Sequence, residues 1–82
     1  MPERLDAAVV WYVELRGPGA IDTLRALLQG LAGQPGLLGA ELLTSPAQPD
    51  LALLASRWAT EAPHLPLPSG AKSWVFEVIE GC

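Results

Sequence analysis

Residues 7–16 read Ala-Ala-Val-Val-Trp-Tyr-Val-Glu-Leu-Arg, and this stretch decides the fold. β-Branched and aromatic residues suit the pleated surface of a strand, in which successive side chains point to opposite faces of a sheet. Alternation divides the stretch into two sets: Val9, Trp11, Val13 and Leu15 on one face, and Ala8, Val10, Tyr12, Glu14 and Arg16 on the other. Both sets are mainly apolar, so we expect this strand to need cover on both faces.

One amphipathic helix follows the turn at residues 17–19. Its apolar residues recur at spacings of three and four, which places them along a single stripe: Ile21, Leu24, Leu27, Leu28 and Leu31. Gly33 is suited to cap the helix at its C-terminal end, and Pro35 prevents the helix from continuing. Because only one side of the helix is apolar, we expect it to cover one face of a sheet.

Three further strands are predicted over residues 37–43, 51–60 and 73–80. Two prolines in residues 44–50 predict a loop there, and three prolines in residues 61–72 predict a second loop with no comfortable helical turn. The 82 residues are therefore expected to form a single α+β domain.

The strands at residues 51–60 and 73–80 are also mainly apolar on both faces. One helix covers a few strands on one side of a sheet, so the other side would expose an apolar patch larger than monomers usually tolerate. Face-to-face pairing of two copies resolves this, and twofold dimers are the commonest assembly. We therefore expect a homodimer that forms through the sheet faces.

The order strand, helix, strand, strand, loop, strand and two short motifs resemble the dimeric α+β barrel superfamily, specifically domains of the antibiotic biosynthesis monooxygenase type. Residues 34–43, Gln-Pro-Gly-Leu-Leu-Gly-Ala-Glu-Leu-Leu, are similar to the family's Pro-Gly-hydrophobic-hydrophobic stretch before its second strand. Residues 56–62, Ser-Arg-Trp-Ala-Thr-Glu-Ala, are similar to the end of its third strand, where a Trp closes an apolar run. The resemblance covers nearly the whole chain, although its motifs are short.

The resemblance implies a ferredoxin-like β-α-β-β-α-β plan, with two antiparallel sheets that meet to form a barrel. Family members include cofactor-free oxygenases of aromatic polyketides and enzymes that degrade haem, besides many with no assigned reaction. In this chain the prolines of residues 61–72 replace or shorten the second helix. The haem-degrading members use an Asn, a Trp and a His, and this chain has no Asn, which disfavours that activity. A ubiquitin-like fold also fits the order of elements but leaves the double-sided apolar strands unexplained.

The composition argues against several classes of partner. The net charge is −4 and the five basic residues are scattered, which argues against nucleic acid or an anionic membrane surface as partner. No apolar stretch approaches the roughly 20 residues that cross a bilayer, and the first residues do not resemble a secretion signal. The single cysteine, Cys82, excludes an internal disulfide framework and a cysteine-based metal site. We expect a bacterial, cytoplasmic protein with no metal and no bound cofactor.

His64 is the candidate for a catalytic general acid or base, because histidine is the side chain that exchanges protons most readily near neutral pH. It lies among prolines, so a solvated connector is the alternative. Trp11, Trp58 and Trp74 can line a pocket for an aromatic ligand, or they can belong to the core or the dimer interface.

Tyr12 and Arg57 are the remaining pocket candidates, since polar side chains within strands face either solvent or a cavity that offers them partners. The alternative for Arg57 is an ion pair across the sheet with one of three carboxylates: Glu14, Glu41 or Glu77.

Two functions remain open. In the first, the protein is monooxygenase-like and binds a flat apolar or aromatic small molecule between sheet and helix. Whether it is an enzyme stays open; such an enzyme would be a cofactor-independent oxidoreductase acting by positioning and proton transfer. In the second, it is a non-catalytic dimeric structural or interaction module with a packed barrel interior. An internal cavity on the order of several hundred Å³ lined by polar groups would count against the second function.

Overall fold

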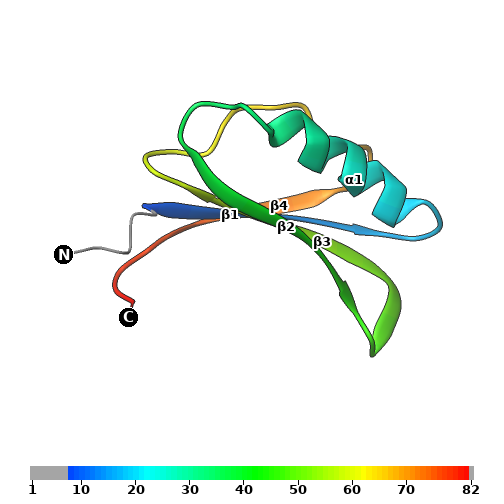
Figure 1. The fold of residues 1–82 in the computed structure, drawn as a ribbon. Coiled ribbons are helices and arrows are strands. Elements are labelled where there is room, and N and C mark those ends of the chain that lie inside the picture. Colours follow the sequence, from blue (N-terminus) through cyan, green and yellow to red (C-terminus); the bar gives the residue numbers. More distant parts are fainter. Residues whose placement is uncertain (1–7, 82) are drawn as a thin grey trace.

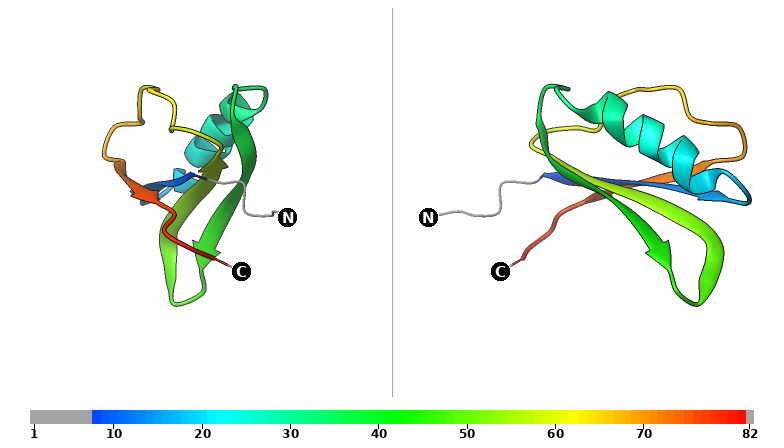
Figure 2. Two further views of the ribbon diagram at one scale, coloured as in Figure 1. Left: turned by 90° about the vertical axis from the view of Figure 1, so that its left-hand side faces the viewer. Right: turned by 45° about the vertical axis from the view of Figure 1, so that its right-hand side comes forward.

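One helix lies on one face of a four-stranded antiparallel sheet (Figure 1), and Figure 2 shows the same arrangement from two further sides. The computed structural model describes residues 8–81. Its elements follow the chain in this order: β1 (Val9–Arg16), α1 (Ala20–Leu31), β2 (Leu37–Ser45), β3 (Gln48–Trp58) and β4 (Lys72–Glu77). Ala7, where the first strand was predicted to begin, lies outside the described residues, as does Cys82. No helix in this part of the chain is both long and apolar enough to span a membrane.

The strands lie in the order β2-β3-β1-β4, so β1 and β3 occupy the centre of the sheet. All three pairings are antiparallel. This is the ferredoxin-like arrangement, and the predicted α+β class is confirmed. The ubiquitin-like alternative requires a mixed sheet and is therefore wrong. The third and fourth strands were predicted to extend beyond the observed ends of β3 and β4.

The loop predicted over residues 44–50 is wrong, because β2 and β3 form a tight hairpin. Ser45 pairs directly with Gln48, which leaves only a short turn between the two strands. Pro49 lies inside β3 near the exposed tip of the hairpin, where the register of the pairing shifts. A proline is tolerated at such an irregular, solvent-exposed strand end because its missing N–H leaves no buried acceptor unpaired.

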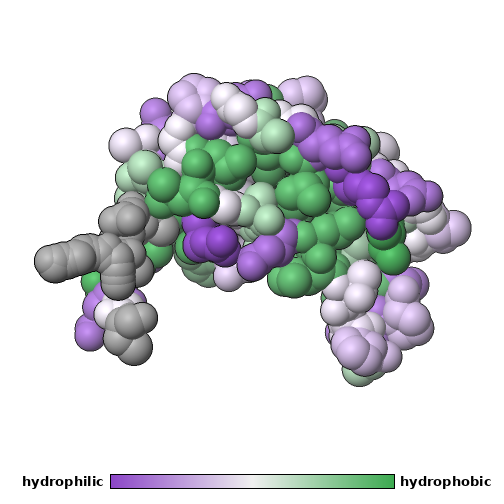
Figure 3. Space-filling view, in the orientation of Figure 1, coloured by the Kyte–Doolittle hydropathy of each residue, from purple (hydrophilic) through white to green (hydrophobic). Residues whose placement is uncertain are grey.

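The core lies between α1 and the face of the sheet that α1 covers. Its buried residues come from β1, α1 and β3: Val9, Trp11, Val13, Ala20, Leu24, Leu31, Ala52, Leu54 and Trp58. Burying one Val or Leu side chain contributes about 1.5–3 kcal/mol, so this layer supplies the main stabilisation of the fold. At the edge strand β2 the layer reaches the surface, where apolar residues form a band beneath α1 (Figure 3).

Two buried polar side chains satisfy each other inside this core. The Trp58 indole Nε1–H donates to Ser56 Oγ at 2.8 Å, and the Ser56 hydroxyl donates to the Trp11 carbonyl oxygen at 3.3 Å. Ser56 and Trp58 are both fully buried. The pair therefore links the end of β3 to β1 without leaving a buried donor unpaired.

The other face of the sheet carries no helix, and we call it the open face. Tyr12 of β1 meets Phe76 of β4 there in an edge-to-face contact, with ring centroids 5.7 Å apart. Trp74 and Phe76 remain 42% and 54% exposed, and Leu43 of β2 adds to the same surface. The apolar character of the open face agrees with the expectation that the sheet needs cover on both sides.

Replacing Ser56 with Ala is expected to lower the free energy of unfolding by about 1–3 kcal/mol, because the buried Trp58 indole N–H loses its acceptor. Urea unfolding at one fixed protein concentration measures this change. Ser69→Ala, at an exposed position before β4, is the control and should shift stability by less than about 0.5 kcal/mol. Equal stability of the Ser56 variant and the original chain would show that the hydrogen bond is not structural.

Candidate functional site

Between β3 and β4, residues 59–71 cross the α1 side of the sheet as coil, without a helix. One backbone hydrogen bond ties the start of the segment to the turn before β2, and another closes a turn near its end. The Ala59 N–H donates to Gly36 O at 2.8 Å, and the Ala71 N–H donates to Pro68 O at 3.1 Å. The coil therefore stands where the ferredoxin-like plan has its second helix.

The helix α1 packs on β2, β3 and β1 but not on β4, so the sheet around β4 is covered only by the coil. Ala62 and Leu65 of the coil pack against the core and fill part of the space. The remainder is a pocket of about 490 Å³ that opens to solvent. Small-molecule sites in proteins typically have volumes of about 300–1,000 Å³.

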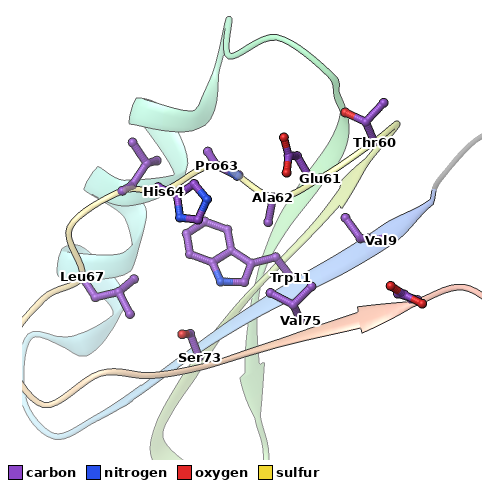
Figure 4. A pocket seen from close by; sticks show the side chains of 12 residues that line it. Val9, Trp11, Thr60, Glu61, Ala62, Pro63, His64, Leu67, Ser73 and Val75 are labelled. Carbon is purple, nitrogen blue, oxygen red and sulfur yellow. The ribbon is translucent and has the colours of Figure 1, made fainter.

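The pocket has apolar walls and a polar rim (Figure 4). The walls come from β1, β4 and the coil: Val9, Trp11, Ala62, Leu65, Leu67 and Val75. The rim consists of exposed polar residues: Thr60, Glu61, His64, Ser73 and Glu77. An apolar cavity with a few polar groups at its edge can both hold a small ligand and fix its orientation.

Trp11 and His64, both candidates from the sequence, line this pocket together (Figure 4). Trp11 projects from the central strand β1 and is almost fully buried, so its indole forms the floor. His64 projects from the coil and is exposed at the rim. The fold thus combines an aromatic surface with a side chain that can exchange protons.

The other four candidates lie elsewhere. Trp58 is fully buried in the core and does not line the pocket. Tyr12, Arg57 and Trp74 belong to the open face, on the opposite side of the sheet. Arg57 Nη1 lies 3.1 Å from Glu41 Oε1, so the ion-pair interpretation of Arg57 is confirmed.

Sequence analysis missed the residues of β4 that complete the pocket. Val75 and Glu77 alternate with the residues of the open face, and this alternation already separates them from Trp74. The missing information was the order of the strands. Val75 pairs with Trp11 because β4 lies next to β1.

A second hollow, of about 620 Å³, lies between the turn before α1 and the β2–β3 hairpin. Arg25 Nη1 is engaged there by Asp22 Oδ1 at 2.9 Å, and the part of the lining that the structure describes has neither an aromatic side chain nor a histidine. Within residues 8–81, no three His, Cys, Asp or Glu side chains gather in a way that could hold a metal ion. We therefore place the candidate site at the pocket that contains Trp11 and His64.

The sequence of the chain matches the model of one family of known proteins. A family model described as antibiotic biosynthesis monooxygenase matches residues 18–65, which is more than half of the chain. The chain belongs to this family. No curated protein and no solved structure matches it.

The match to the antibiotic biosynthesis monooxygenase family runs from the turn before α1, through β2 and β3, into the coil. It includes His64 but neither Trp11 of β1 nor any part of β4. The resemblance identified from the sequence is thus confirmed, while the two strands that form the floor and one wall of the pocket lie outside the matched segment.

The rates of amide hydrogen exchange should distinguish the coil of this antibiotic biosynthesis monooxygenase domain from its strands. No backbone N–H in residues 60–70 donates to another backbone group of the described chain. Amides such as those of Leu65 and Leu67 should therefore exchange much faster than those of Trp11 and Val13 in β1, which pair within the sheet. NMR-detected exchange measures this. Protection of residues 60–70 at the level of β1 would contradict the coil and indicate a helix.

Proposed function

We propose that this protein is a monooxygenase-like α+β barrel protein that binds a flat, apolar small molecule in the pocket between the sheet and the coil. The pocket itself supports this proposal, because about 490 Å³ of space combines apolar walls with polar groups at the rim. Sites for small molecules are typically concave, mainly apolar and furnished with only a few polar groups.

Trp11 and His64 define what such a ligand meets. The Trp11 indole offers a flat apolar surface, which suits an aromatic ring system. His64 lies at the exposed rim, where an imidazole can take up a proton from a bound phenol or return one to it. The side chains of the pocket are therefore suited to positioning a ligand and to proton transfer, and neither task needs a cofactor.

The alternative is a non-catalytic dimeric module with a packed interior. Fully buried Trp58 and Ser56 favour it, since they fill the centre of the core and leave no space there for a ligand. The pocket near β4 favours the binding function, because a packed module would bring its walls into contact.

We also propose that two copies pair through their open faces. Every residue of β4 is exposed in the single chain, including Trp74 and Phe76. Contiguous exposed apolar surface is typical of interaction sites, and two sheets packed face to face would cover both open faces at once. The single cysteine of the sequence suits a reducing cytoplasm, where we place the protein.

Fluorenone, a flat uncharged ketone, is a suitable probe of the pocket. Val75→Phe is expected to weaken its binding about tenfold or more, because the larger ring occupies space in the pocket. Val78→Phe, the same substitution just beyond β4 and outside the pocket lining, should bind fluorenone as the original chain does. Isothermal titration calorimetry measures both affinities. Equal affinities of the two variants would place the site elsewhere, and no saturable binding would favour the packed module.

Two neighbouring substitutions on β4 test the dimer. Phe76→Asp is expected to convert a dimer of about twice 8.7 kDa into a monomer, because burying an unpaired carboxylate is costly. Val75→Asp changes an adjacent residue of nearly equal exposure, 55% against 54%, that points to the other face, so the mass should not change. Size-exclusion chromatography with light scattering at low micromolar concentration measures both. A monomeric original chain would contradict the proposal.

A further inference from the structure

Trp11 places a hydrogen-bond donor, its indole Nε1–H, at the floor of the pocket. The residue is only 5% exposed, yet its indole Nε1–H meets no acceptor among residues 8–81. The other buried tryptophan is satisfied, since the Trp58 Nε1–H donates to Ser56 Oγ at 2.8 Å. Within residues 8–81, a tryptophan indole is thus paired in the core and has no partner at the floor of the pocket.

The position of this donor indicates where its acceptor comes from. Buried indole N–H groups usually find a partner, and one without an acceptor destabilises the folded state. Trp11 lines the pocket, and Figure 4 shows the nitrogen-bearing edge of its ring turned toward the side where Leu67 and Ser73 lie. The donor therefore faces the interior of the pocket, where an atom of a bound ligand can reach it.

Within residues 8–81, the formally charged side chains that line the pocket are acidic. Glu61 of the coil and Glu77 of β4 both line it, and its lining within the described chain includes no Lys or Arg. Both carboxylates are exposed, so their effect is screened by salt over about 8–10 Å near physiological ionic strength. Within that range they disfavour an anionic ligand relative to an uncharged one.

We propose that Trp11 is the specificity-determining residue of this pocket, and that its indole N–H donates a hydrogen bond to an oxygen or nitrogen acceptor of a flat, uncharged ligand. Glu61 and Glu77 discriminate against anions at the rim. This inference rests on the proposed ligand-binding function and deepens it by naming the chemistry of the ligand. The ligand inserts its acceptor edge toward β1 and leaves its other edge at the rim, where His64 lies.

Two probes that differ in one group test the donor. Fluorenone has a carbonyl acceptor, and fluorene has a methylene group in its place. Trp11→Phe should lower the affinity for fluorenone, relative to the affinity for fluorene, by about five- to tenfold. This is the effect of losing one hydrogen bond. The loss of ring volume in this variant affects both probes alike and therefore cancels in the ratio.

Trp74→Phe is the matched control, because it makes the same substitution on the open face and should leave the ratio unchanged. An unchanged ratio for Trp11→Phe would overturn this inference while the pocket function stands. Failure of the original chain to bind either probe would overturn the proposed function itself, and the inference with it.

A measurement on the unaltered chain keeps the test valid even where Trp11→Phe fails to fold. The three tryptophans give three indole N–H resonances, and Trp74→Phe assigns one of them. The other two resonances belong to Trp11 and Trp58, which are both buried. On addition of fluorenone, the Trp11 indole N–H resonance should move downfield and exchange more slowly with solvent. Fluorene should cause neither change. The same response to both probes would overturn the inference.

The rim is tested with the carboxylate and the carboxamide of fluorenone, which have nearly the same shape. At low ionic strength the carboxylate should bind at least about threefold more weakly than the carboxamide. The double variant Glu61→Gln, Glu77→Gln should remove this difference. A difference that survives in the double variant would overturn the role of the two carboxylates.

Discussion

A single helix has to cover the apolar face of four strands, and it is too small for that task. A helix of 12 residues is about 18 Å long and about 10 Å wide, while four strands spaced about 4.8 Å apart form a wider face. Because α1 packs on β2, β3 and β1, the core collects there and β4 remains outside it. The coil that crosses β4 adds a few apolar side chains but no second helix. The pocket and the exposure of β4 both arise because no second helix packs on this part of the sheet.

The strand β4 contributes side chains to both the pocket and the open face. Val75 and Phe76 are neighbours in the chain with nearly equal exposure, yet one faces the pocket and the other faces the open side of the sheet. On β1, Trp11 and Tyr12 divide in the same way. The proposed ligand and the proposed partner therefore share the same two strands. Pairing of the open faces would hold in place the strand that forms one wall of the pocket.

Local periodicity predicted the fold well, because the direction of a side chain repeats with the period of its own element. Alternation in β1 and the spacing of leucines in α1 were both sufficient. The β2–β3 hairpin was mispredicted because Pro49 was interpreted without the partner strand that tolerates it. The site was predicted only in part for a similar reason. Chemistry selected Trp11 and His64, but only the pairing of β4 with β1 places Val75 beside Trp11.

The prolines of the coil have a consequence for binding. Pro63, Pro66 and Pro68 each restrict φ to near −65°, which narrows the conformations open to the unfolded chain. This segment therefore loses less conformational entropy when it is ordered than a flexible loop of the same length. A ligand of the proposed site would meet a wall whose shape is largely set in advance, so less of its binding free energy would be offset by ordering the protein. The loss of a helix in this chain is at the same time the gain of a preorganised wall.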